Sequence, residues 1–294
     1  MTAAPETVAA RPAVAQRRQP RIGLGRIALH AIIILLMALW LVPTLGLFFT
    51  SLLAPERFNE SGWWQILSKP SLATLDNYDK VFNTDAIVSS LWTTVLVSLG
   101  GTIFPIFIAA MAAYAFAWLD FPGRDWLFIL VIAMLVVPIQ MALIPIFKLY
   151  SDLNLFDTVI GLILFHTAFG LPFAIFLLRN FFIGIPRDLM EAARIDGASE
   201  IRIFLRLMLP LALPAIASLA IFQFLWTWND LLVALTFGRE TQPITVAIFT
   251  QLRQFGSNIE LIAPAAFVSL AIPLAVFFAF QRYFVEGLLA GSVK

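Results

Sequence analysis

The stretch EAARIDGASEIRIFLRLMLP, from Glu191 to Pro210, is a polar segment of twenty residues between long apolar runs. Four arginines, four acids and several small residues lie within it or just before it: Arg187, Arg194, Arg202, Arg206, Asp188, Glu191, Asp196, Glu200, Ala192, Ala193, Gly197 and Ala198. Charge is scarce in the rest of the chain. The segment therefore marks a place where the chain leaves an apolar environment and presents a polar surface.

The composition places the chain in a membrane. Of its 294 residues, 61% are hydrophobic and only 13% are charged, whereas a soluble domain carries about 25% charged residues. Several apolar runs of about 18 residues or more are long enough to cross a bilayer as helices. We expect an all-α integral membrane protein. The net charge of +1 gives no sign of a nucleic-acid partner, and the lack of cysteine excludes disulfides and thiolate metal sites.

The sequence predicts six membrane spans. They lie at about 27–53, 86–118, 126–147, 158–181, 207–235 and 261–284, with a charged loop at 182–206. Residues 1–25 are rich in Ala, Pro, Gln and Arg, which is typical of a disordered tail. Residues 26–294 then form one transmembrane domain. The first apolar run is too long for a signal peptide, whose apolar core has about 7–15 residues.

The distribution of lysine and arginine predicts the orientation. With both termini inside, the cytoplasmic segments hold thirteen of these residues and the outer segments hold six. Cytoplasmic loops of membrane proteins carry the excess of Lys and Arg. Both termini and the charged loop are therefore expected on the cytoplasmic side.

Local signals within the charged loop predict two short helices. Pro186 is suited to the first turn of a helix, and Gly197 is suited to ending it. Ser199 is then a natural N-cap for a second helix that runs into the fifth span. In the first helix Glu191 stands four residues from Arg187 and three from Arg194, so these charges can pair on one face.

Another face of the first predicted helix is small and shallow. It carries Met190, Ala193 and Gly197 at helical spacing, and such a face suits docking into a groove of another protein. Anionic lipid head groups around a basic cytoplasmic loop are the alternative. The residues by themselves leave both interpretations open.

The loop also resembles a known signature. The pattern EAA-x3-G-x9-L-x-LP is similar to the signature loop of permease subunits of bacterial ABC importers, with Leu207 where isoleucine is usual. FAIFLLRNFFIGIPRDLMEAARIDGAS, the WND of Trp228–Asp230 and the C-terminal QRYFVEGLLAGSVK resemble the carbohydrate importers, most closely the smaller permease of the maltose type. The resemblance covers about residues 70–294.

This resemblance implies a fold, partners and a role for the loop. The fold would be that of a type I importer permease in the bacterial cytoplasmic membrane, moving a sugar or oligosaccharide. The partners would be a second related permease, two ATPase subunits that hold ATP and Mg, and an extracytoplasmic solute-binding protein facing residues 54–85 and 236–260. The loop would seat a coupling helix in an ATPase cleft through Glu191, Ala192, Ala193, Gly197, Ala198 and Ser199.

The sequence contains no motif for ATP binding and no catalytic arrangement. It has no G-x-x-x-x-G-K-[ST] phosphate loop, so ATP and Mg belong to partner subunits. We assign it no catalytic residue, no metal site and no cofactor of its own. The spans offer only His30, His166 and Asp230 as acid or base groups, which argues against a membrane enzyme. An ion-coupled secondary carrier is the alternative, but that class would be expected to have more carboxylates in the membrane and two matching halves.

Polar residues within spans are candidates for a translocation pathway, because they usually face a protein interior or an aqueous cavity. They are Gln140, Gln223, Trp228, Asn229 and Asp230, with His166 and Trp226 nearby. An aromatic face beside amide or carboxylate groups suits a sugar ring. In the alternative interpretation these residues only hydrogen-bond across helices, and the tryptophans form an interfacial belt.

Overall fold

The computed structural model describes residues 24–58, 62–255 and 258–290 of the chain. They fall into two units, Met1–Leu45 and Gly46–Lys294, and each is described by itself. The first unit contributes most of helix α1 (Leu24–Leu52), which includes an apolar run of 28 residues. The predicted disordered tail lies outside the described residues, except for its last two positions, which are helical.

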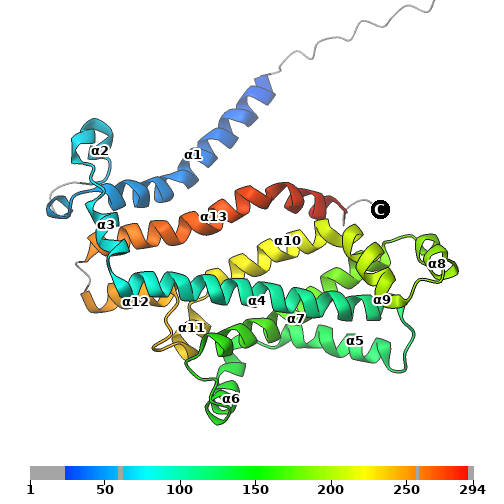
Figure 1. Ribbon diagram of the computed structural model, residues 1–294. Helices are drawn as coiled ribbons and strands as arrows, with labels where there is room; N and C mark the ends of the chain where they lie inside the picture. Colours follow the sequence, from blue (N-terminus) through cyan, green and yellow to red (C-terminus); the bar gives the residue numbers. More distant parts are fainter. Residues whose placement is uncertain (1–23, 59–61, 256–257, 291–294) are drawn as a thin grey trace, which may run out of the picture. The chain divides into compact units, whose positions relative to one another are not determined.

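The second unit is built almost entirely of helices (Figure 1). In chain order they are α2 (Gln65–Ser68), α3 (Asp76–Phe82), α4 (Asp85–Trp118), α5 (Arg124–Ala133), α6 (Ile139–Asp152), α7 (Val159–Ile183), α8 (Arg187–Ile195), α9 (Glu200–Ile203), α10 (Leu209–Trp228), α11 (Leu232–Phe237), α12 (Ile244–Phe255) and α13 (Ile259–Ala290). Short 3-10 turns lie at Pro55–Arg57, Pro70–Leu72 and Met134–Val136.

Five helical segments among the described residues are long and apolar enough to span a membrane, and a bent helix pair makes a sixth candidate. The five are Gly25–Leu52, Asp85–Trp118, Val159–Ile183, Glu200–Trp228 and Ile259–Arg282. The prediction of an all-α membrane protein is thus confirmed, and the six predicted spans agree with the five candidates plus the bent pair. The third and fifth spans differ in shape from the prediction.

The third span is broken rather than continuous. Its two halves, Arg124–Val136 and Ile139–Asp152, meet at an angle of 102°. Pro138 lies at the break, and Val137 before it is extended, with ψ 114°. Proline has no N–H to donate and disfavours helical geometry in the preceding residue. The structure thus divides the predicted third span, 126–147, into two helices.

The fifth span begins earlier and ends earlier than predicted. A π-helical turn, Phe204–Met208, joins α9 to α10, so one helical segment extends from Glu200 to Trp228. Pro210 follows this turn, and its ring would otherwise press on the carbonyl of the preceding turn. The helix stops at Trp228, and residues 232–237 form the separate helix α11.

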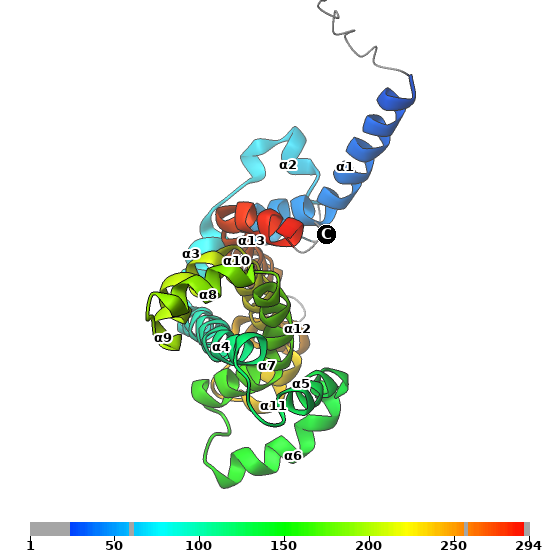
Figure 2. The same ribbon diagram turned by 90° about the vertical axis from the view of Figure 1, so that its right-hand side faces the viewer.

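Three helices, α4, α7 and α10, make the core of the second unit, with α13 against α10 (Figure 2). The contact between them is lined with small residues, which let helix backbones approach closely in lipid. Buried alanines occur on all three helices: Ala109, Ala110, Ala113, Ala174, Ala212 and Ala215. The alanine-rich patch of the second span is thus a packing surface. In Figure 1, α8 and α9 lie at one end of this core and α12 lies at the other.

Candidate coupling site

Helix α8 ends in a Schellman motif, which explains the glycine of the charged loop. The N–H of Gly197 donates to Arg194 O at 3.0 Å, and the N–H of Ala198 donates to Ala193 O at 3.1 Å. Gly197 has φ +75°, a left-handed conformation that side chains with a Cβ avoid. The predicted stop at Gly197 is confirmed.

The start of each short helix also lies close to its predicted position. Pro186 occupies the N-cap of α8, one residue before the first helical residue. Ser199 occupies the N-cap of α9 with extended backbone, but its hydroxyl makes no capping hydrogen bond. Its carbonyl accepts from the N–H of Ile203 at 2.9 Å. Ser199 therefore fits the turn through its backbone rather than through its side chain.

Of the three residues on the face of α8 that suits docking, Met190 and Ala193 point inward and Gly197 is exposed. Met190 is fully buried in the core of the second unit, and Ala193 packs partly against the same core. Ala198, between the helices, is also partly buried there. The most exposed large apolar side chains of α8 and α9 are Ile195 and Ile201, which are 86% and 72% exposed. Met190 and Ala193 thus anchor α8 to the second unit, and the opposite side of the helix is open.

The remaining predicted coupling residues lie on the open side. Glu191, Ala192, Gly197 and Ser199 are all exposed. The six predicted coupling residues thus divide into four exposed residues and two partly buried alanines, Ala193 and Ala198. This division depends on the direction in which Met190 is buried, which the periodicity of a nine-residue helix does not give.

A polar network ties the loop to α4. Tyr114 donates a hydrogen bond to one carboxylate oxygen of Glu200, and Arg194 Nε lies 2.9 Å from the other. The hydrogen bond with Glu200 raises the pKa of Arg194 above its ordinary value. Among the described residues neither predicted pair, Arg187–Glu191 or Glu191–Arg194, forms an ion pair, because Arg194 is drawn toward Glu200.

Gln223, a predicted pathway residue, is a cross-link inside the helix core. Its side chain is 6% exposed, and Nε2 donates to Gly101 O at 3.0 Å, with His166 O at 3.4 Å. It therefore joins α10 to both α4 and α7. A Cβ on Gly170 would stand 2.5 Å from Gln223 Nε2, so glycine is needed for this approach. These contacts are of the kind that the hydrogen-bonding alternative describes.

Trp228 is also a packed residue. Only 1% of it is exposed, and its indole Nε1 donates to Ser269 O on α13 at 2.9 Å. An indole N–H inside a membrane protein needs such a partner. Trp228 offers no open aromatic face to a sugar in this structure.

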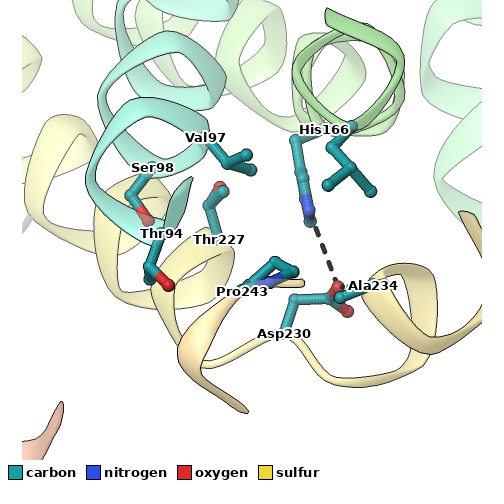
Figure 3. A pocket seen from close by; sticks show the side chains of 9 residues that line it. Thr94, Val97, Ser98, His166, Thr227, Asp230, Ala234 and Pro243 are labelled. Atoms are coloured by element: carbon teal, nitrogen blue, oxygen red, sulfur yellow. Dashed lines mark hydrogen bonds and ion pairs between the residues drawn. The ribbon is translucent and has the colours of Figure 1, made fainter. Parts of the chain in front are cut away.

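Asp230 organises the end of the fifth span. Its carboxylate accepts from the N–H groups of Val233 and Ala234 at 3.3 and 3.0 Å, and so caps α11. Its carbonyl accepts a hydrogen bond from Thr245 Oγ1 at 2.6 Å, which connects Asp230 to α12. His166 Nε2 lies 3.7 Å from Asp230 Oδ2 (Figure 3).

The cavity beside Asp230 is small. Figure 3 shows Thr94, Ser98 and Thr227 facing it together with His166 and Asp230. Its volume is about 10 Å³, whereas small-molecule sites have roughly 300–1,000 Å³. A sugar ring does not fit there. Of the predicted pathway residues, only Gln140 and Asn229 are exposed, on α6 and at the end of α10.

Sequence reasoning missed Tyr114, the α4 anchor of the loop. It stands in the alanine-rich part of its span, where an isolated phenol is a polar group that needs a partner. That signal predicts a hydrogen bond, but not that the acceptor lies 86 residues further on. Asp157 was missed as well: its carboxylate accepts from the N–H groups of Glu240 and Thr241 at 2.9–3.0 Å.

The fold and this site define a multi-pass helical membrane protein that carries an anchored amphipathic helix with an open apolar face. Residues 101–289 match the family of binding-protein-dependent transport system inner membrane components. The chain belongs to that family, and it is the membrane component of such a transport system.

Similar permease proteins of other organisms support membership of this family. The osmoprotective compounds uptake permease protein GgtD of Synechocystis sp. is 45% identical over 275 residues, 92% of each chain. The alpha-glucoside transport system permease protein AglG of Rhizobium meliloti is 50% identical over 233 residues, 76% of this chain and 61% of AglG. The trehalose transport system permease protein SugB of Mycobacterium tuberculosis is 40% identical over 230 residues, 76% of this chain and 84% of SugB.

The fold also resembles solved structures. A chain from the crystal structure of a bacterial ABC transporter involved in alginate import superposes with a TM-score of 0.76 at 20% identity. The match covers 90% of this chain and 100% of that one. This likeness is one of fold.

Proposed function

We propose that the chain is a membrane-spanning subunit of an ATP-driven importer for a sugar or oligosaccharide in the bacterial cytoplasmic membrane. Its partners are a second related permease, two ATPase subunits that bind ATP and Mg, and an extracytoplasmic solute-binding protein. The names of GgtD, AglG and SugB support a glycoside-like or osmoprotective solute. The ATPase subunits supply the energy, since the chain has no phosphate loop.

The difference in burial between the two sides of α8 supports its coupling role. Met190 is buried in the membrane unit, while Ile195 on the same helix is 86% exposed. An exposed isoleucine on a helix fixed from behind suits insertion into a groove of a partner protein. The α8 helix is the element that transmits movement of an ATPase subunit to α7 and α10.

A docking experiment tests this assignment. The Ile195→Glu variant, co-expressed with its neighbouring transport subunits, is expected to insert into the membrane but to lose the ATPase subunit on purification. Leu75→Glu is the matched control, since Leu75 is 70% exposed on the segment before α3. Full recovery of the ATPase subunit and normal ATP-dependent uptake with Ile195→Glu would contradict the role of α8.

The proposed orientation has its own test. The chain contains no cysteine, so a single introduced thiol reports on one position. We expect a membrane-impermeant maleimide to label Thr74→Cys in intact cells, and to label Ser199→Cys only after the membrane is opened. The reverse pattern would place the charged loop outside.

The substrate class is tested through uptake. Unlabelled α-glucosides and trehalose are expected to compete with a labelled glucoside in proteoliposomes that hold the whole transporter and its binding protein. Uptake should require ATP and persist when ion gradients are collapsed. Uptake abolished by an ionophore in the presence of ATP would instead support the ion-coupled carrier.

A further inference from the structure

A cavity lined by arginine lies beside α8, where the spans α4, α5 and α7 end. Its volume is about 390 Å³. Four guanidinium groups contribute to its walls, and they come from α5, α7 and α8: Arg124, Arg179, Arg187 and Arg194. Two carboxylates, Asp120 and Glu191, also line it. The charge balance of the cavity is therefore positive.

Two of the four arginines have carboxylate partners. Arg124 Nη1 lies 2.9 Å from Asp120, and Arg194 Nε lies 2.9 Å from Glu200. The Asp120 carboxylate is thus already engaged. These two arginines are held in place by the protein itself.

The other two arginines have no ion pair among the described residues. Arg179 Nε donates to the carbonyl of Phe116 at 3.3 Å, and its guanidinium carbon lies 3.9 Å from the ring centre of Phe128. Phe116 and Phe128 therefore orient Arg179 without neutralising it. Arg187, at the start of α8, is exposed. Arg179 and Arg187 together carry two positive charges against the one carboxylate of Glu191, so these groups leave a net positive charge for an anion.

The surroundings indicate which anion. The cavity lies where three apolar helices end, and Ile183 and the indole-bearing residue Trp118 form part of its wall. Trp126, at the start of α5, is 78% exposed. Tryptophans of this kind mark the level of lipid head groups. Basic pockets between transmembrane helices bind phospholipid head groups, and planar guanidinium groups suit phosphate oxygens.

We propose that this cavity binds the phosphate of an anionic phospholipid, held between Arg179 and Arg187. The acyl chains would follow the apolar helices, while the head group fills the polar end. This site goes beyond the proposed function, because its ligand is a lipid rather than the sugar or an ATPase subunit, although Glu191 of the coupling set also lines the cavity. A lipid bound there would bridge α7 to the first turn of α8 and stabilise the position of the coupling helix.

The test measures retained lipid. The intact transporter is reconstituted in nanodiscs of phosphatidylcholine with a minor fraction of phosphatidylglycerol, then extracted gently for native mass spectrometry. Wild type is expected to retain phosphatidylglycerol, and the double variant Arg179→Gln/Arg187→Gln to retain about ten- to thirty-fold less, since each cation near a surface contributes roughly 1 kcal/mol. Arg202→Gln/Arg206→Gln, a pair of exposed arginines on the same loop, is the matched control.

A single variant and a measurement with free phosphate test the proposal further. Arg187→Gln alone keeps the buried contacts of Arg179, so it should fold normally and still retain several-fold less phosphatidylglycerol. Inorganic phosphate added to pure phosphatidylcholine nanodiscs should not raise the melting temperature of wild type, whereas phosphatidylglycerol should. Equal lipid retention by wild type and Arg187→Gln, an equal loss in the control pair, or equal stabilisation by free phosphate would overturn the proposal.

Discussion

Tyr114 on α4 donates a hydrogen bond to Glu200, the first residue of α9, and Glu200 in turn holds Arg194 at the end of α8. The three side chains connect a membrane span to both short helices of the charged loop. The network therefore links α8 to α4 directly, while the continuous segment Glu200–Trp228 joins α9 to α10.

Tyr114→Phe should weaken this connection while leaving the ring in place. We expect ATP-dependent uptake to fall several-fold with less loss of ATP hydrolysis. The free energy of unfolding should fall by about 1.5–3 kcal/mol, the range for a hydrogen bond to a charged group. Uptake and hydrolysis measured together in proteoliposomes check this. Tyr150→Phe is the control, because its hydroxyl donates to Gly161 O far from the loop. Equal coupling in both variants would contradict the prediction.

Asp230→Ala should destabilise the end of the fifth span by about 1–2 kcal/mol, since it removes the N-terminal cap of α11. Asp230→Asn retains an acceptor and should lose less. Thermal unfolding of the purified transporter measures both. Asp152→Ala, an exposed acid at the end of α6, should change stability by no more than about 0.5 kcal/mol. A melting temperature equal to wild type in Asp230→Ala would show that the cap contributes nothing.

Gly170→Ala should be more disruptive than its size suggests. The added methyl would meet Gln223 Nε2 at 2.5 Å, and overpacking of this kind costs roughly 1–3 kcal/mol. The Gln223→Ala variant makes room but loses the link to Gly101. In a double-mutant cycle, the two changes together should therefore cost less than their sum. Strict additivity would contradict direct contact between the two sites.

Asp157→Ala should loosen the turn that precedes α12. The carboxylate of Asp157 accepts from the N–H groups of Glu240 and Thr241, and its own φ is +59°. Asparagine tolerates this left-handed conformation and keeps an acceptor, so Asp157→Asn is the conservative control. Hydrogen exchange at Glu240 and Thr241 is expected to accelerate in Asp157→Ala and to change much less in Asp157→Asn. Unchanged exchange in the alanine variant would remove Asp157 from this role.

Interactions between residues close in sequence were enough to predict where the short helices of the charged loop begin and end. The end of α8 at Gly197 and the start of α9 after Ser199 depend on residues within one turn of each other, so the sequence predicts them. The pathway residues show the opposite. Gln223 and Trp228 are polar groups in a span, which predicts a partner but not its identity, and their acceptors are backbone carbonyls of other helices.

Length, hydrophobicity and charge are local properties, so the amino-acid sequence is enough to predict a membrane protein of about six apolar helices with a polar loop before the fifth. Tertiary structure alone decided which face of α8 is open, since the burial of Met190 depends on helices far away in the chain. It also decided the partner of Glu200, and it gathered Arg179 and Arg187 around one cavity. Such contacts join residues that no local pattern relates.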